Sequence, residues 1–169
     1  MAGKIAILLD DGFEDLEFFY PYFRVQEDNF EPVVLGVEPK LAKGKNGLYF
    51  QITETLAKHN PEEFVGLYIP GGHAPDRLRR FDEVKEFVSA FYKLGKPIGT
   101  ICHGPQVLIS AKVVEGVTMT SVSAIKDDLE NAGAIWVNQP VVVDKNIVSS
   151  RVPDDLPFNL PAFLALLPK

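Results

Sequence analysis

The sequence predicts an α/β fold with a mainly parallel sheet and helices on both of its faces. Residues 4–9 and 65–70 are short, continuous apolar runs, which are typical of strands buried on both faces. Segments with the 3.6-residue periodicity of helices lie between such runs and are joined to them by short loops, as in parallel sheets with helical crossovers. The length of 169 residues and the 46% of apolar residues fit one domain, residues 1–169, around a single core.

The strands of this sheet are predicted from apolar runs that end at turn-forming residues, at 4–9, 31–37, 65–70 and 97–101. Two further segments carry the pattern of hairpins. Residues 44–53 contain the turn Lys45-Asn46-Gly47-Leu48 and run into a strand, and residues 141–150 place Asp144-Lys145-Asn146 between two short strands.

The predicted helices are 13–28, 81–94, 104–114, 123–132 and 156–167. In the first helix, Leu16, Phe19, Tyr20 and Phe23 form the expected apolar face. Pro21 lies in the interior of this helix and is expected to kink it, because proline removes one backbone hydrogen bond.

Charge and cysteine content exclude several classes of protein. The chain has 23 acidic and 17 basic residues and a net charge of −6, which disfavours binding to nucleic acid. Its single cysteine, Cys102, excludes internal disulfides and metal sites built from several thiolates. No Gly-x-Gly-x-x-Gly run follows a strand, which disfavours a flavodoxin-like cofactor binder. We expect no cofactor and no metal. Without a recognisable signal peptide or an apolar stretch of ~18 residues, we expect a cytoplasmic protein with no membrane partner.

Three of the predicted strands end in unusual sequences, and in a parallel sheet such ends meet at one edge, where sites form. The first strand runs into Asp10-Asp11-Gly12-Phe13-Glu14-Asp15. The third runs into Pro70-Gly71-Gly72-His73 and the fourth into Cys102-His103-Gly104-Pro105. We therefore expect these segments to form one site.

Cys102 is the candidate nucleophile. It comes directly after a strand and directly before a helix, where a sharp turn between small residues, here Thr100 and Gly104, exposes a nucleophile. The N-terminus of the following helix favours the thiolate over the thiol. The alternative interpretation of a lone cysteine is a small buried apolar side chain.

Neighbouring residues supply candidate partners for Cys102. His103 is a candidate base, and it would need a carboxylate to orient it. Gly71 and Gly72 could offer backbone N–H groups to an oxyanion. Glu14 lies at the end of the first strand, where a carboxyl group close to a thiolate would have a raised pKa and could donate a proton to the sulfur.

Six ordered segments make the sequence recognisable, and the chain resembles the PfpI family of the ThiJ/PfpI superfamily over nearly its whole length. The segments are Phe13-Glu14-Asp15, Gly44-Lys45-Asn46-Gly47, Pro70-Gly71-Gly72-His73-Ala74-Pro75-Asp76, Ile101-Cys102-His103-Gly104-Pro105-Gln106, Ile125-Lys126-Asp127-Asp128 with Asn131-Ala132-Gly133-Ala134, and Ser149-Ser150-Arg151-Val152-Pro153-Asp154-Asp155-Leu156.

The resemblance implies a flavodoxin-like three-layer α/β sandwich with a nucleophilic cysteine on a strained elbow. It implies that a glutamate, matched here by Glu14, is hydrogen-bonded to Cys102. It further implies that an acidic residue of a neighbouring subunit, matched by Asp76, orients His103, and hence that the chain forms a homodimer or a larger homo-oligomer. His73 adjoins the two glycines and is expected to help bind substrate.

The activities that the resemblance implies are those of an intracellular cysteine peptidase, a glyoxalase or a deglycase, all based on addition of a thiolate to a carbonyl. Many peptidase-type members have glutamate at the position of Asp76, and some have tyrosine at the position of Val122; both departures weigh against proteolysis. The alternative function is that of a non-catalytic redox or stress sensor, in which Cys102 is oxidised.

Overall fold

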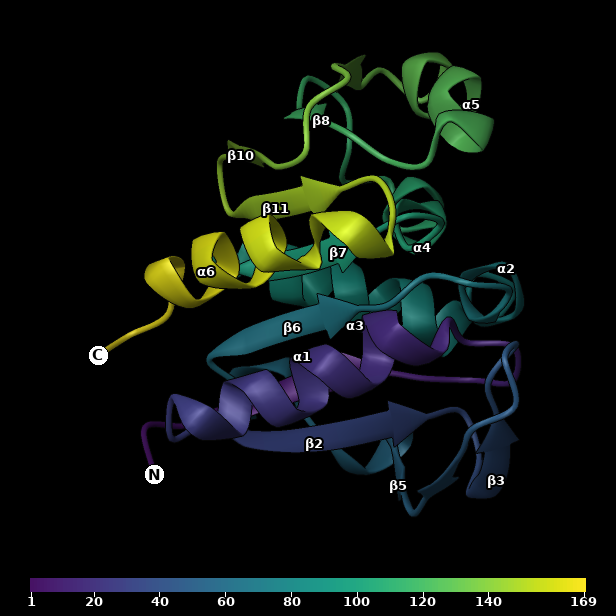
Figure 1. Cartoon of the computed structure of the whole chain (residues 1–169), viewed down its shortest axis with the longest axis vertical. Coiled ribbons are helices and arrows are strands. Elements are labelled where there is room, and N and C mark those ends of the chain that lie inside the picture. The colour runs from purple at the N-terminus through teal and green to yellow at the C-terminus, as the bar shows by residue number, and fades with distance from the viewer.

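A seven-stranded sheet forms the centre of the computed structural model, which describes all 169 residues (Figure 1). The strand order is β10-β11-β7-β6-β1-β2-β5, and only β10 runs antiparallel to its neighbour. This arrangement confirms the predicted, mostly parallel sheet. The strands are β1 (Lys4–Leu8), β2 (Glu31–Gly36), β5 (Glu54–Thr55), β6 (Gly66–Ile69), β7 (Ile98–Ile101), β10 (Val142–Asp144) and β11 (Ile147–Ser150).

Helices cover both faces of the sheet (Figure 1). On one face lie α1 (Asp15–Glu27) and α6 (Leu156–Leu166), and on the other α3 (Asp82–Lys93) and α4 (Pro105–Ser110). The central strands are fully buried between these layers, which explains their continuous apolar sequence. The shorter helices are α2 (Ala74–Leu78) and α5 (Lys126–Asn131), and single 3-10 turns occupy Leu56–Lys58, Pro61–Glu63, Ser123–Ile125 and Pro153–Asp155. No helix is long and apolar enough to cross a membrane.

The buried face of α1 differs from the predicted one. Leu16 and Phe23 are each 59% exposed, whereas Phe18 and Val25 are fully buried. Apolar residues occur on most sides of this helix, so periodicity alone could not select the side that packs on the sheet. The consequence is an outward-facing row of apolar side chains on α1.

Short strands and helix ends account for the other differences. The hairpin around residues 44–48 joins β3 (Lys40–Lys43) to β4 (Tyr49–Ile52), and a separate two-stranded sheet pairs β8 (Thr118–Met119) with β9 (Ile135–Trp136). α4 ends at Ser110, four residues earlier than predicted, and Lys112 follows with a left-handed φ of 59°. The segment predicted as helix 123–132 begins as a 3-10 turn and becomes α-helical only at Lys126.

The three unusual strand ends lie together, as expected, because β7, β6 and β1 are consecutive in the sheet. Their parallel register pairs Ile69 with Thr100 and Ile7 with Tyr68. The segments that follow β1, β6 and β7 therefore leave the same edge of the sheet side by side.

Candidate active site

Cys102 forms a sharp elbow between β7 and α4. Its φ of 60° lies in the left-handed region, which is costly for a residue with a Cβ and is often found at functional sites. Two hydrogen bonds hold this backbone: the Cys102 N–H donates to the Ser150 carbonyl at 3.0 Å, and the Val122 N–H donates to the Cys102 carbonyl at 3.1 Å. Gly104 has to be small, because a Cβ at that position would overlap the Thr100 hydroxyl.

The sulfur of Cys102 is partly buried and lies 3.4 Å from Nδ1 of His103. Burial raises the pKa of the Cys102 thiol to about 12, and the charge of the Glu17 carboxylate adds to this increase, while the His103 N–H and the Lys45 ammonium oppose it. The resting site therefore favours the thiol, which is the opposite of the direction expected from the helix N-terminus alone.

The carboxyl group beside Cys102 belongs to Glu17 and not to Glu14, so the prediction of Glu14 is wrong. Glu14 is the N-cap of α1: its Oε2 accepts from the Glu17 N–H at 2.7 Å, and its Oε1 accepts from Asn46 Nδ2 at 3.1 Å. A capping side chain has to fold back toward the free N–H groups of the first turn, which turns it away from the sulfur. Glu17 is fully buried and accepts from the Gly71 N–H at 3.0 Å.

Glu17 is held in its neutral form at neutral pH. Burial raises its pKa to about 8 and the Glu14 charge adds to this, while hydrogen bonds from the Gly71 N–H and with Cys102 lower it. Its Oε2 is buried and makes no hydrogen bond within the chain, so it is free to bind a thiolate formed at the neighbouring Cys102. A protonated Glu17 places no charge beside the sulfur and can donate a hydrogen bond to a thiolate.

Gly71 and Gly72 have different roles. The Gly71 N–H is bound to Glu17 and is not free for an oxyanion while this bond holds, so its predicted role stays a prediction. A Cβ on Gly71 would overlap Glu17 Oε1 and lie 2.9 Å from the Cys102 Cβ, which shows how closely these side chains flank it. Gly72 has a φ of +83°, and its N–H makes no hydrogen bond within the chain, so it remains available to a ligand.

His103 is the candidate base next to the sulfur. Burial lowers the pKa of His103, and the neighbouring charges of His73 and Lys45 lower it further. The imidazole is therefore neutral at neutral pH and can accept a proton at Nδ1. His73 is close enough to contribute to this effect and begins α2, with its N–H donating to the Gly12 carbonyl at 2.7 Å.

Asp76 does not contact His103 within this chain. Its carboxylate lies on α2, is exposed, and pairs with Arg80 one turn later at 2.6 Å. The expected orientation of His103 by Asp76 across a subunit interface stays a prediction.

Sequence reasoning gave no role to the tip of the β3–β4 hairpin, which completes the site. Asp15 accepts from the Asn46 and Leu48 N–H groups, each at 2.9 Å, and this docking places Lys45 where its charge acts on Glu17, Cys102 and His103. The turn sequence of residues 45–48 was the signal from which this part of the site could have been predicted. No group of three or more His, Cys, Asp and Glu side chains is arranged to hold a metal ion.

The model of the DJ-1/PfpI family matches residues 3–164, and the chain therefore belongs to the DJ-1/PfpI family. Deglycase PfpI of Pyrococcus furiosus is 43% identical over 164 residues, which cover 97% of this chain and 99% of the relative. Protein/nucleic acid deglycase 2 of Escherichia coli is 44% identical, with 98% and 99% coverage. Putative cysteine protease YraA of Bacillus subtilis is 42% identical, with 92% and 93% coverage.

Solved structures share the fold. The two-domain protein from Anabaena variabilis, with dj-1/thij/pfpi-like and ferritin-like domains, superposes with a TM-score of 0.94 at 38% identity. The match covers 99% of this chain and 50% of that longer chain. DJ-1beta of Drosophila melanogaster gives a TM-score of 0.90 at 24% identity, covering 100% of this chain and 92% of that chain. These neighbours confirm the flavodoxin-like sandwich.

Proposed function

We propose that this protein is a cysteine-dependent enzyme in which the sulfur of Cys102 adds to a carbonyl carbon, with deglycase or glyoxalase-type activity ahead of peptidase activity. One observation carries the proposal: the only cysteine of the chain occupies a strained elbow between the neutral imidazole of His103 and the buried carboxyl group of Glu17. Relatives named deglycase or putative cysteine protease support the same class of reaction.

In the first step, Nδ1 of His103 accepts the proton of the Cys102 thiol, and protonated Glu17 stabilises the thiolate by donating a hydrogen bond. The sulfur then forms a bond to the carbonyl carbon, and the electron pair of the C=O bond moves to oxygen. The free N–H of Gly72 can stabilise this oxygen, which then takes the proton from His103. With an aldehyde, the product of this step is a hemithioacetal.

An amide substrate follows the same first step and then loses its amine. Here the oxyanion stays unprotonated: its electron pair re-forms the C=O bond as the C–N bond breaks, and His103 gives the proton that it took from the thiol to the leaving amine. Water later releases the acyl group from the sulfur. A single set of residues thus supports addition to aldehydes and cleavage of amides, so the substrate decides between the named activities.

The experiment compares methylglyoxal, a methylglyoxal-modified amine and a fluorogenic peptide as substrates of the wild type and of Cys102→Ala. Turnover of at least one substrate that disappears in Cys102→Ala supports the enzyme. If no substrate is turned over while peroxide oxidises Cys102 selectively at neutral pH, the proposal fails and the redox-sensor alternative replaces it.

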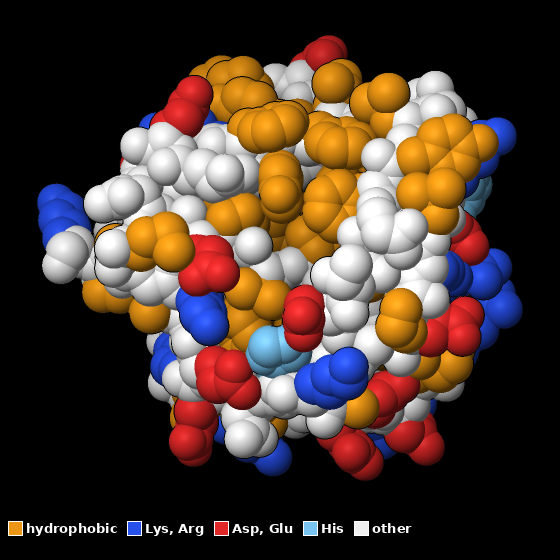
Figure 2. All heavy atoms as spheres, turned by 90° about the horizontal axis from the view of Figure 1, so that it is seen from below, with side chains coloured by type: hydrophobic (Ala, Val, Ile, Leu, Met, Phe, Trp, Pro, Cys, Tyr) orange, Lys and Arg blue, Asp and Glu red, His pale blue; other side chains and the backbone are white.

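We also propose that the protein acts as a homo-oligomer in which Asp76 of a second copy faces His103. Figure 2 shows a broad apolar patch on the face seen from below, at the end of the molecule where α1, β2 and β5 lie in Figure 1. Among the apolar side chains of α1, Leu16, Tyr20 and Phe23 are exposed. Exposed apolar groups of this extent are typical of protein interfaces.

Light scattering coupled to size-exclusion chromatography tests this assembly. The wild type is expected to have at least twice the mass of the chain, and Phe23→Glu, which buries a charge in the contact, is expected to reduce it. Asp76→Ala should keep the assembly and lower kcat. A wild-type monomer with full activity would contradict the proposal.

A further inference from the structure

A pocket of about 370 Å³ opens at the carboxyl edge of the sheet, next to the elbow. Its lining includes residues 121–123 and 151–152, which continue the two segments hydrogen-bonded to the backbone of Cys102 through Val122 and Ser150. Neighbouring backbones in a sheet lie about 5 Å apart. Val122 lines the pocket and its N–H binds the Cys102 carbonyl, so the pocket lies beside the backbone of the elbow.

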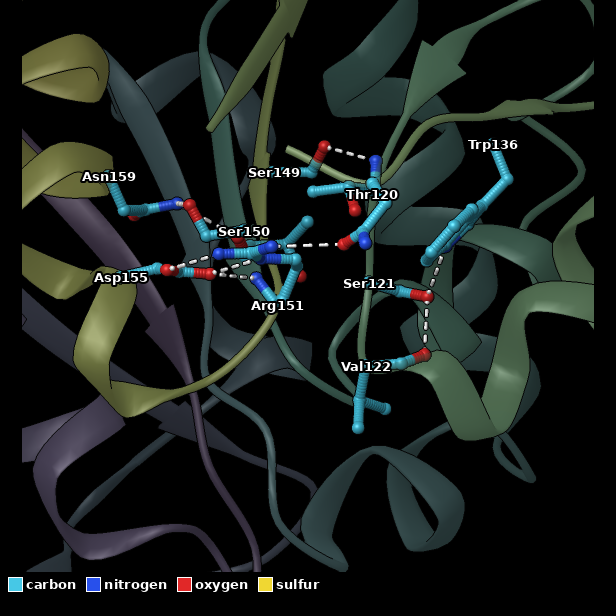
Figure 3. Close-up of polar contacts among 11 residues, drawn as sticks. Thr120, Ser121, Val122, Trp136, Ser149, Ser150, Arg151, Asp155 and Asn159 are labelled. Atoms are coloured by element: carbon cyan, nitrogen blue, oxygen red, sulfur yellow. Dashed lines mark hydrogen bonds and ion pairs between the residues drawn. The ribbon is translucent and has the colours of Figure 1, made fainter. Parts of the chain in front are cut away.

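Hydrogen bonds fix the walls of the pocket (Figure 3). On one side, Trp136 Nε1 donates to the Ser121 hydroxyl at 3.0 Å, and this hydroxyl donates to the Val122 carbonyl at 2.8 Å. On the other side, Arg151 binds the buried carboxylate of Asp155 through Nε at 2.9 Å and Nη2 at 3.1 Å. The pocket is thus a preformed cavity with one aromatic wall and one guanidinium wall.

The free polar groups of the pocket are donors of Arg151 and Asn138, together with the Ser123 hydroxyl, which can donate or accept. Arg151 Nη1 donates to Asn138 Oδ1 at 2.9 Å, so three of the five N–H groups of the guanidinium are used in these contacts and two remain. The oxygen of the Asn138 side chain is occupied, which leaves its NH₂ group as a donor. Asp155 and Ser121 have their acceptor atoms engaged by the contacts above. A ligand that fits has to bring acceptors.

The two cations near the pocket are both ion-paired within the chain, Arg151 with Asp155 at 2.9 Å and Lys126 with Glu130 at 3.7 Å. The ammonium group of Lys126 lies 5.3 Å from the centre of the Trp136 ring, and Arg151 contributes a second cation. Asp155 neutralises the inner edge of Arg151, so the outer edge of the guanidinium is the part that faces a ligand. A planar carboxylate matches the fork-shaped guanidinium and the flat indole wall.

We propose that this pocket binds the carboxylate group of the substrate, so that the enzyme prefers carbonyl adducts of amino acids with a free carboxylate to their carboxamide-capped analogues. The inference rests on the proposed function for the reaction at Cys102, while the donor pattern of the pocket stands independently. Asn138 and Arg151 are then specificity-determining residues that touch the substrate away from the reacting carbon.

Binding can be measured without turnover, because Trp136 is the only tryptophan of the chain. N-acetylalanine and N-acetylalaninamide are titrated into Cys102→Ala protein, followed by tryptophan fluorescence and by calorimetry. The carboxylate is expected to bind saturably and at least tenfold more tightly than the carboxamide, as expected for a charge-assisted hydrogen bond. Equal binding of the two ligands, or no saturable binding, would overturn the inference.

The matched variants are Asn138→Asp and Asn131→Asp. Asn138→Asp keeps an acceptor for Arg151 but replaces the free donors with a negative charge, so carboxylate affinity is expected to fall at least tenfold. Asn131→Asp adds the same charge on exposed surface at the end of α5 and is expected to change affinity less than twofold. Equal effects of the two variants would contradict a specific pocket.

Turnover separates this inference from the proposed function. If the carboxylate binds but no turnover depends on Cys102, the proposed function fails and the pocket stands. If turnover depends on Cys102 but kcat/KM is the same for carboxylate and carboxamide substrates, the enzyme stands and the specificity is wrong.

Discussion

Replacing Glu17 tests how the sulfur is made reactive. At pH 7 Glu17 is protonated, so the carboxylate charge that raises the pKa of the Cys102 thiol is absent. In Glu17→Leu, a thiolate formed at this pH loses its only candidate carboxyl donor and stays buried, so less thiolate is expected to form. A hydrogen bond to a charged group contributes about 1.5–3 kcal/mol, and one pKa unit corresponds to about 1.4 kcal/mol. The thiolate population at pH 7 is therefore expected to fall by the equivalent of roughly 1–2 pKa units, and alkylation at pH 7 should slow about 10- to 100-fold.

Glu17→Gln and Glu14→Gln are the controls for this substitution. Glu17→Gln keeps an N–H donor for the sulfur and adds no charge, so its thiol should remain closer to the wild type than that of Glu17→Leu. Glu14→Gln changes the capping residue, which binds Glu17 N–H and Asn46, and should affect stability more than thiol pKa.

The assay is the pH dependence of the alkylation rate with iodoacetamide, which reports on one site because the chain has a single cysteine. Thiolate absorbance at 240 nm gives an independent titration. The reasoning is refuted if Glu17→Leu leaves the alkylation rate at pH 7 unchanged, or if Glu14→Gln lowers this rate by as much.

Three further predictions concern stability and packing. The pKa of Glu17 is raised from 4.5 to about 8, so the folded state holds a proton that the unfolded state loses above about pH 4.5, and stability falls as pH rises between these values. Glu17→Gln should be more stable than the wild type by roughly 3 kcal/mol at pH 7 in urea titrations, with the gap closing toward pH 4.5. Gly71→Ala places a methyl group against Glu17 and the Cys102 Cβ, so Tm should fall and alkylation of the thiol should change; an unaltered thiol titration would contradict the close packing. Arg151→Ala leaves the buried Asp155 carboxylate without its guanidinium partner, which should cost about 1–3 kcal/mol of unfolding free energy. The double variant Arg151→Ala with Asp155→Asn should recover part of this loss. No recovery would exclude the unpaired charge as the cause.

The position of the nucleophile could be predicted because it depends on local sequence. A strand that ends directly before Cys102, a helix that starts at Pro105, and small residues at 100 and 104 define the elbow without reference to the rest of the fold. The parallel sheet was predictable for a similar reason, since each buried strand has its own apolar run.

The partner of the sulfur could not be chosen from the sequence, because Glu14 and Glu17 lie in the same turn and compete for two roles. Glu14 takes the capping role, and that choice depends on the N–H groups freed at the start of α1. One signal was available: Glu17 is the charged residue that precedes Phe18 and Phe19 in an apolar stretch. Burying a charged group costs free energy unless the group is paired or neutralised, so an acidic residue in such a stretch is a candidate for a functional role.

The pairing of Arg151 with Asp155 and the orientation of α1 depend on tertiary structure in the same way. Both faces of α1 contain aromatic residues, so the sheet decides which of them is buried. The loop after β11 brings Arg151 onto Asp155 through a 3-10 turn, and sequence spacing does not specify that geometry.

The central claim is that the sulfur of Cys102 forms a covalent bond to the substrate during turnover. Intact-mass spectrometry of protein quenched during reaction with a methylglyoxal-modified amino acid tests it directly, with Cys102→Ala as the matched sample. The account predicts an adduct of one substrate fragment per chain in the wild type, located on Cys102, and none in the variant. Turnover that persists in Cys102→Ala would contradict it.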